Sequence, residues 1–137
     1  MEKEYLFVYG TLLNSFPKNP FKNSFHKNAS YLGAGKISAK LYDLGKYPGI
    51  VKNIEGENFY VFGEIYEILN PKFLQVLDEY ENYFPENLSK SEYTREKINV
   101  NLINNGQELM TWVYWYNNLP NDALFIESGD YIGYLVD

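Results

Sequence analysis

Glu81 is the side chain of this sequence whose type and position suit acid–base chemistry. It ends a predicted helix, since Asn70 suits the N-cap and Pro71 suits the first helical position, where no N–H is needed. At about 100° per residue, Glu81 falls between Leu74 and Leu77, on the apolar side of the helix. A carboxyl group there faces a core or a cleft, and desolvation raises its pKa toward the range that suits a base or acid near neutral pH.

A second interpretation of Glu81 is a helix-end residue whose side chain bends back into water. For an isolated glutamate this is the commoner outcome, because charged side chains rarely stay buried without a partner. The same helical wheel places an apolar set on one arc, Phe73, Leu74, Val76, Leu77 and Tyr80, and a polar set on the other, Gln75, Asp78, Glu79 and Asn82. We therefore expect Asp78 and Glu79 to be ordinary solvated charges.

The turn after the first predicted strand is another candidate site. The strand Tyr5–Tyr9 is nearly all apolar and ends at Gly10, which permits backbone angles that other residues resist. Such a turn can point successive N–H groups into a cavity and so bind an anion. Taken alone, Tyr-Gly-Thr-Leu is a short pattern that many proteins contain by chance, and a plain turn is then the simpler interpretation.

The composition limits the class of protein. The chain has 137 residues, which predicts a single domain over residues 1–137, and its 18% aromatic content suits a β-rich core and an aromatic-lined pocket. Twelve basic and eighteen acidic residues give a net charge of −6, so we expect no nucleic-acid partner. Cysteine is absent and His26 is the one histidine, which leaves almost nothing for a thiol nucleophile, a metal site or a Ser-His-Asp triad. We therefore expect no metal.

No apolar run approaches the ~20 residues of a membrane span. The charged start Met1–Glu4 leads directly into a strand, without the pattern of a signal peptide. We expect a cytoplasmic protein that does not contact a membrane.

The predicted elements are mostly strands. Strands are predicted at Tyr5–Tyr9, Tyr31–Tyr42, Phe59–Leu69, Glu92–Ile103 and Leu109–Tyr116, with helices from Asn19 to about His26 and from Asn70 to about Asn82. Asn104–Gln107 predicts a type I′ hairpin turn, because Asn-Gly at its centre supplies two positive φ angles. With five or six strands, one good helix and mostly hairpin connections, the expected class is α+β, with a sheet that curls into a barrel.

Four segments occur in one order along the chain. They are Tyr9-Gly10-Thr11-Leu12; Leu41–Gly45, which leads into Tyr47–Val51; Gly63–Ile68, which precedes Leu77–Glu81; and Tyr93-Thr94-Arg95. As an ordered set spanning roughly residues 5–131, they resemble the γ-glutamylcyclotransferase superfamily, in its short AIG2-like branch that includes γ-glutamylamine cyclotransferases. The resemblance implies a small mixed, mostly antiparallel β-barrel with flanking helices and a cavity at one end.

The resemblance also implies roles for residues. The family's loop Tyr9-Gly10-Thr11-Leu12 forms one wall of the cavity and holds the substrate through backbone N–H groups. Its single catalytic acid closes the Leu-Asp-x-x-Glu stretch, which here is Glu81. Two positions depart from the family pattern: Asn82 replaces the usual Gly but tolerates the left-handed region, and Leu13 replaces a frequent basic residue.

The chemistry that the resemblance implies is an internal aminolysis of a small γ-glutamyl substrate. The free α-amine attacks the γ-carbonyl, closes a five-membered ring and releases 5-oxoproline, with Glu81 as general acid and base. This reaction needs no cofactor. The sequence predicts neither the leaving group nor the oligomeric state.

Six further residues are expected to contact the substrate: Tyr42, Pro48, Gly49, Tyr93, Arg95 and Tyr116. Tyr93 and Arg95 point the same way on one strand, either into the cavity or as an exposed pair. Tyr42 and Tyr116 either line the pocket or are core aromatics, and the segment around Pro48 is either a pocket loop or a packed surface loop.

Two other functions compete with the enzyme. A non-catalytic small-molecule binding protein on the same scaffold is the main alternative, because a fold does not fix a function. An aromatic-faced barrel that binds glycans or single-stranded nucleic acid is disfavoured by the acidic charge.

Overall fold

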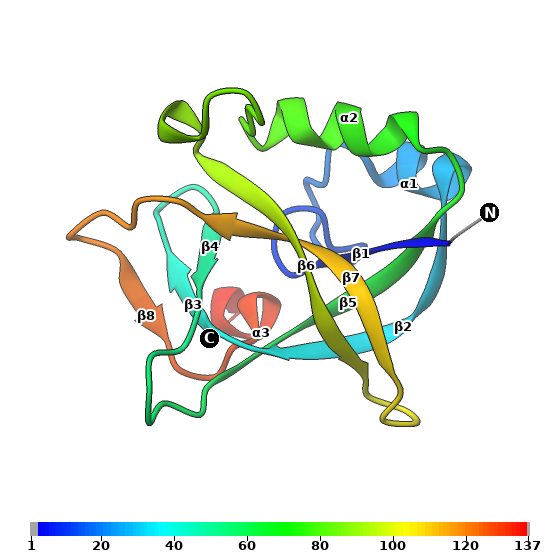
Figure 1. Ribbon diagram of the computed structural model, residues 1–137. Coiled ribbons are helices and arrows are strands. Elements are labelled where there is room, and N and C mark those ends of the chain that lie inside the picture. The colour runs from blue at the N-terminus through cyan, green and yellow to red at the C-terminus, as the bar shows by residue number, and fades with distance from the viewer. Residues whose placement is uncertain (1–2, 137) are drawn as a thin grey trace.

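Five strands close into a barrel in the order β1-β5-β2-β6-β7 (Figure 1). They are β1 (Glu4–Val8), β2 (Ala29–Ser38), β5 (Tyr60–Ile68), β6 (Tyr93–Leu102) and β7 (Glu108–Tyr116). In this computed structural model, which describes residues 3–136, the barrel pairs are antiparallel except β1 with β7, which run parallel. The expected α+β class with a small mixed, mostly antiparallel barrel is confirmed.

A second sheet, which the sequence did not predict, packs beside the barrel. Its strands follow the order β4-β3-β8, with β3 at Lys40–Asp43, β4 at Pro48–Val51 and β8 at Leu124–Ile126. The aromatic segment expected to be a loop is therefore a strand pair. Its connection is tight because Gly45 has a φ of 108° and donates its N–H to Oδ1 of Asp43 at 2.8 Å.

Three α-helices flank the barrel: α1 (Lys22–Asn28), α2 (Lys72–Tyr80) and α3 (Tyr131–Val136). In Figure 1, α2 crosses the top of the barrel with α1 beside it, and the rings of Phe25 and Phe73 meet edge to face at 5.0 Å between them. A 3₁₀ turn at Leu88–Lys90 lies between α2 and β6. Within residues 3–136, no helix combines the length and apolar composition that crossing a membrane requires.

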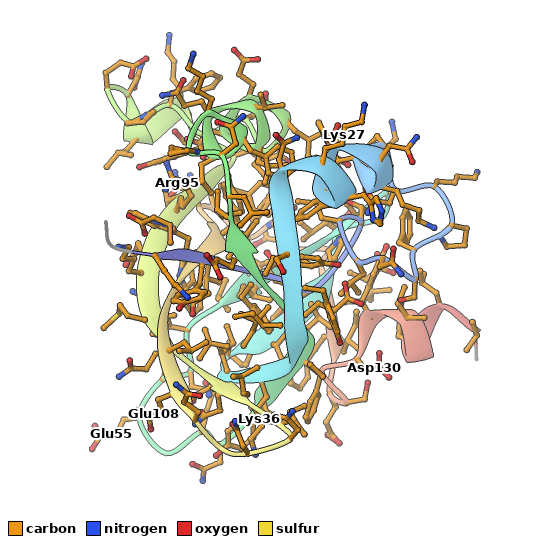
Figure 2. The ribbon with its side chains drawn as sticks, turned by 90° about the vertical axis from the view of Figure 1, so that its right-hand side faces the viewer. Lys27, Lys36, Glu55, Arg95, Glu108 and Asp130 are labelled. Atoms are coloured by element: carbon orange, nitrogen blue, oxygen red, sulfur yellow. The ribbon has the colours of Figure 1, made fainter. Side chains whose placement is uncertain are left out.

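The strands divide their side chains between two cores. In β1, Phe7 points into the barrel interior, whereas Leu6 and Val8 pack under α1 and α2. A strand buried on both faces must be apolar at every position, which explains the nearly continuous apolar run that begins at Tyr5. Charged side chains such as Lys27, Glu55 and Asp130 lie around the outside (Figure 2).

The β6–β7 hairpin forms where the sequence predicts it, but the prediction of a type I′ turn is wrong. Only one of the two required positive φ angles is present: Gly106 has a φ of 72°, and Asn105 is not in the left-handed region. The side chain of Asn105 instead accepts the N–H of Gln107 at 2.9 Å, and Gly106 donates its N–H to Leu102 O at 2.8 Å. This local Asn hydrogen bond stabilises a longer loop over residues 103–107.

Gly63 of β5 packs tightly against the end of β1, so a side chain at this position is expected to destabilise the fold. A Cβ added there would lie 2.1 Å from the carbonyl oxygen of Val8 and 2.9 Å from the ring of Phe7. Gly63→Ala is expected to lower the free energy of unfolding by about 1–3 kcal/mol, because the backbone of β5 must shift. Urea unfolding measures this change, and Asn99→Ala, exposed on β6, is the control with an expected change within about 0.5 kcal/mol. Equal stabilities of Gly63→Ala and wild type would contradict the close packing of these strands.

Candidate functional site

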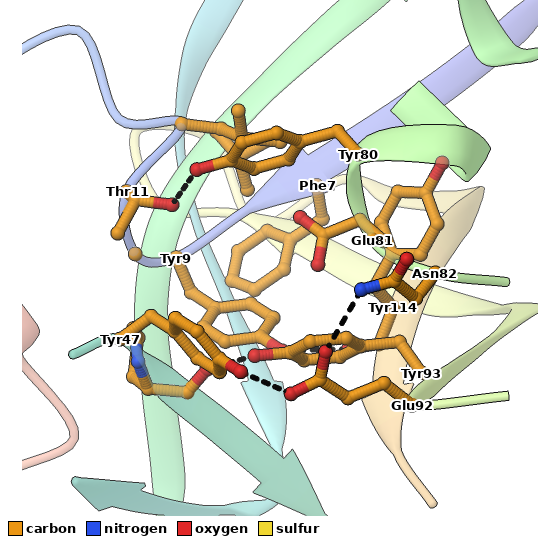
Figure 3. Close-up of a pocket in the computed structure, with 14 residues that line it drawn as sticks. Phe7, Tyr9, Thr11, Tyr47, Tyr80, Glu81, Asn82, Glu92, Tyr93 and Tyr114 are labelled. Atoms are coloured by element: carbon orange, nitrogen blue, oxygen red, sulfur yellow. Dashed lines mark hydrogen bonds between the residues drawn. The ribbon is translucent and has the colours of Figure 1, made fainter. Parts of the chain in front are cut away.

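A pocket of about 160 Å³ opens where several elements end at one side of the barrel (Figure 3). Its wall is built from the end of β1 and the following turn (Phe7–Leu12), the end of α2 (Tyr80–Asn82), the start of β4 (Tyr47 and Pro48), the start of β6 (Glu92 and Tyr93) and Tyr114 of β7. Residues far apart in the sequence thus meet at one point. The wall is aromatic with two carboxylates in it.

Most of the predicted site residues line this pocket. They are Tyr9, Gly10, Thr11, Leu12, Pro48, Glu81 and Tyr93. The structure brings them together from four elements, and their roles toward a substrate stay predictions.

Helix α2 positions Glu81 as the wheel predicts. The helix begins at Lys72 after Pro71, and the side chain of Asn70 accepts the N–H of Lys72 at 3.2 Å. Glu81 continues the last turn by donating its N–H to Leu77 O at 2.9 Å. Asn82 then ends the helix in the left-handed region with a φ of 53°. The wheel is wrong in detail, since Val76 and Tyr80 of its apolar set are 46% and 39% exposed.

Asp78 is not the solvated charge that the sequence predicts. It is buried, and its carboxylate accepts hydrogen bonds from Nε of Arg95 at 2.7 Å and from Nη2 of Arg95 at 2.9 Å. The hydroxyl of Tyr114 donates to the same carboxylate at 2.7 Å. Asp78 follows Leu74 by four residues and precedes Glu81 by three, so it shares their face of the helix.

Glu81 is half-buried and its side chain lines the pocket. Desolvation, with smaller contributions from the negative charges of Glu92 and Asp78, raises the pKa of Glu81 from 4.5 to about 8. Glu81 therefore holds a proton near neutral pH and exchanges it in the range where amines do so. This is the behaviour required of a group that both accepts and donates a proton.

Five tyrosines line the pocket, and hydrogen bonds fix their hydroxyl groups: Tyr9, Tyr47, Tyr80, Tyr93 and Tyr114. Tyr9 donates its hydroxyl to Tyr114 O at 2.7 Å, and Tyr93 donates to Pro48 O at 2.6 Å. The hydroxyls of Tyr80 and Thr11 share a hydrogen bond of 3.1 Å, which joins the end of α2 to the turn after β1. Burial raises the pKa of Tyr9 and Tyr93, so both stay neutral.

The turn after β1 presents free backbone donors. Leu13 donates its N–H to Gly10 O at 3.0 Å and closes the turn. Among the described residues, the N–H groups of Gly10, Thr11 and Leu12 have no hydrogen-bond acceptor. A Cβ on Gly10 would lie 2.4 Å from Cγ of Pro48, so only glycine lets the turn approach β4 this closely. Adjacent free N–H groups can bind a carboxylate or an oxyanion.

Four residues that were expected to contact the substrate do not line this pocket, and their contact with a substrate stays a prediction. Tyr42 packs on Phe125 with ring centroids 5.4 Å apart, and Gly49 lies under Cβ of Tyr116. Arg95 forms an ion pair with Asp78, and its guanidinium group lies 4.3 Å from the centre of the Trp112 ring. Tyr116 lies behind the wall, stacked edge to face on Tyr93 at 5.0 Å. Gly49 is buried, and the other three residues are half-buried.

The sequence interpretation missed part of the wall, chiefly Tyr47, Tyr80, Glu92 and Tyr114. Tyr47 lies next to the predicted Pro48, and Tyr80 is adjacent to Glu81, so both had a signal in the neighbouring motif. No sequence signal marked Glu92 or Tyr114, because a charge at the start of a strand and a tyrosine in an aromatic strand are common in proteins.

A wider hollow between α1, β2 and β5 offers less chemistry. Its one carboxylate, Glu64, already accepts the N–H of Asn14 at 2.9 Å and the hydroxyl of Tyr66 at 3.0 Å. Across residues 3–136, no three His, Cys, Asp or Glu side chains are grouped to hold a metal ion.

Comparisons with known proteins agree with the fold. A family model described as gamma-glutamyl cyclotransferase, AIG2-like, matches residues 6–133. Similar solved structures include an AIG2-like protein from Mus musculus (21% identity, TM-score 0.73, covering 96% of this chain and 89% of the mouse chain). Protein YtfP from Escherichia coli is 30% identical with a TM-score of 0.62, and the match covers 93% of this chain and 96% of YtfP. YkqA from Bacillus subtilis is 22% identical with a TM-score of 0.71; the match covers 98% of this chain but 42% of YkqA, so this chain spans less than half of that protein. No curated protein matches the chain.

The raised pKa of Glu81 predicts a pH-dependent stability. A carboxyl whose pKa is higher in the folded chain stabilises the fold below the unfolded pKa, and this contribution is lost as the pH rises from 4.5 through about 8. Glu81→Gln has no such loss. Its free energy of unfolding, relative to wild type, is expected to rise by more than about 1 kcal/mol between about pH 5 and about pH 8. Urea unfolding at both pH values measures it, with exposed Glu79→Gln as the control. Parallel pH curves for Glu81→Gln and wild type would contradict the shift.

The Asp78–Arg95 pair predicts coupled stabilities. Asp78→Asn or Arg95→Leu alone is expected to lower the free energy of unfolding by about 3 kcal/mol, because each leaves a poorly hydrated charge without its partner. The double variant is expected to lose at least about 1 kcal/mol less than the sum of the single variants. A double-mutant cycle by chemical denaturation measures the coupling. Additive losses would show that the two charges do not depend on each other.

Proposed function

Because this chain belongs to the AIG2-like γ-glutamyl cyclotransferase family, we propose that it is an enzyme that releases 5-oxoproline from a γ-glutamyl amine or a γ-glutamyl amino acid. The observation that carries the proposal is Glu81, a carboxyl group with a pKa near 8 in a pocket that also presents free backbone N–H groups. A protein that only binds a ligand has no need for a carboxyl group held in this state. The chemistry of an internal aminolysis does need one.

The reaction forms one C–N bond and breaks another. The α-amine attacks the γ-carbonyl carbon, the five-membered ring closes, and the bond to the leaving nitrogen breaks. The α-ammonium loses two protons as it becomes the ring N–H, and the leaving nitrogen gains two as it departs as an ammonium. Glu81 carries these protons in turn, since its pKa lies close to that of the amines with which it exchanges them.

The rest of the pocket holds the substrate in the conformer that cyclises. Nucleophile and electrophile belong to one molecule, so the main task of the protein is orientation. The free N–H groups of the turn after β1 bind the substrate carboxylate or the oxyanion that develops on the γ-carbonyl. Tyr9 and Tyr93, kept neutral by burial, exclude water and shape the aromatic wall.

The test is turnover of a panel of γ-glutamyl amino acids and γ-glutamyl amines, with 5-oxoproline detected by mass spectrometry. Wild-type protein is expected to release 5-oxoproline, and Glu81→Gln to lower kcat by about 10²–10⁴-fold, because the amide cannot exchange a proton. Glu79→Gln removes an exposed carboxylate from the same helix and is expected to keep the wild-type rate.

Two outcomes would contradict the proposal in different ways. Full activity of Glu81→Gln would assign the proton transfer to another group. Absence of product from every panel member would favour a small-molecule binding protein on the same scaffold.

A further inference from the structure

Glu92 is a second carboxylate in the pocket wall, and the proposed reaction does not yet use it. It lies at the start of the segment that leads into β6 and lines the pocket together with Glu81, and its carboxylate lies next to Tyr47 and Asn82 (Figure 3). No Lys, Arg or His belongs to the pocket wall as the structure describes it. The side chains that line the pocket therefore favour a cation over an anion.

The carboxylate of Glu92 is held in a fixed orientation. Tyr47 donates its hydroxyl to Oε2, Tyr116 donates to the same oxygen at 3.3 Å, and Nδ2 of Asn82 donates to Oε1 at 3.2 Å. A carboxylate offers about four acceptor positions, so these donors leave about one for a ligand. A hydrogen-bond donor of a ligand in the pocket would occupy this last acceptor position of Glu92.

The link between α2 and β6 does not need the charge of Glu92. The backbone N–H of Glu92 donates to Asn82 O at 2.9 Å, and its carbonyl accepts the N–H of Asn117 at 2.9 Å. Any residue at this position makes these two bonds. The negative charge of a carboxylate placed here also raises the pKa of Glu81, which disfavours Glu92 as a purely structural choice.

A γ-glutamyl group carries one carboxylate and one ammonium on the same carbon. The turn after β1 presents backbone N–H donors that suit the carboxylate. The two glutamates present acceptors that suit the ammonium. Resting on the proposed function, we propose that Glu92 is the residue that binds the α-ammonium group of the γ-glutamyl substrate and positions it beside Glu81.

The two carboxylates then have different tasks. Glu81, which holds a proton near neutral pH, exchanges protons with the substrate, whereas Glu92, occupied by three donors, provides the negative charge that attracts the ammonium. An ammonium bound next to Glu92 also favours the ionised form of Glu81, which is the form that accepts a proton.

The test separates ammonium binding from catalysis by using ligands that cannot cyclise. L-methionine sulfone has the α-carboxylate and α-ammonium of a γ-glutamyl group, with a sulfone in place of the γ-amide, and methylsulfonylbutanoate is the same molecule without the ammonium. Calorimetry is expected to show that wild-type protein binds the first at least about tenfold more tightly. Glu92→Gln is expected to reduce this preference to about twofold or less. The control Glu96→Gln removes an exposed carboxylate from the same strand and is expected to keep the preference.

Each other outcome overturns the assignment in a recognisable way. If Glu92→Gln keeps the preference, another group binds the ammonium; if it weakens both ligands equally, Glu92 is only structural. If wild-type protein binds neither ligand at millimolar concentration, the pocket does not take γ-glutamyl groups, and the proposed function falls as well. A measurement on wild-type protein needs no variant to fold: the carboxyl resonance of Glu92 in NMR spectra must respond to L-methionine sulfone and not to methylsulfonylbutanoate.

Discussion

The desolvation of Glu81, reinforced by the negative charges of Glu92 and Asp78, is the constraint on which the pocket depends. Asp78 and Glu92 each act on Glu81 in a poorly hydrated region, where like charges are costly. The charge of Asp78 is compensated by Arg95, and that of Glu92 is spread over hydroxyl and amide donors. Within residues 3–136, the carboxyl group of Glu81 has no ion-pair or hydrogen-bond partner, and it lowers the cost of burial by keeping a proton. Glu81 is therefore the carboxyl group that stays protonated, because Asp78 and Glu92 have partners for their charges.

The barrel supplies the rigid frame for this arrangement. Tyr114 connects its parts, because its hydroxyl donates to Asp78 while its carbonyl accepts the hydroxyl of Tyr9. A single residue of β7 thus fixes both the end of α2 and the end of β1. The two cores on either side of β1 hold that strand on both faces, so the turn that follows it has a defined place opposite Glu81. Such support is what a site needs when proton transfer depends on distance.

The errors of the sequence interpretation have physical reasons. Asp78 was assigned to solvent because a helix alone offers no partner for a buried charge, whereas its partner Arg95 comes from β6. The hairpin turn was given the wrong type because the side chain of Asn105 competes with the backbone geometry that Asn-Gly usually adopts. The segment around Pro48 was expected to be a loop because its strands are short. Strand β4 forms by pairing with β3, and β3 also pairs with the distant β8.

Local physics in the sequence determined the barrel class, the helix that ends at Glu81 and the glycine turn opposite it. These features follow from periodicity and backbone freedom, which act between residues close in the chain. The ordered motifs likewise place the chain in its family. Only the tertiary structure decided that Glu92 and Tyr114 belong to the pocket, that Arg95 pairs with Asp78 outside it, and that Tyr42 lies elsewhere. Those outcomes depend on desolvation and on partners from distant strands, and neither exists until the barrel has closed.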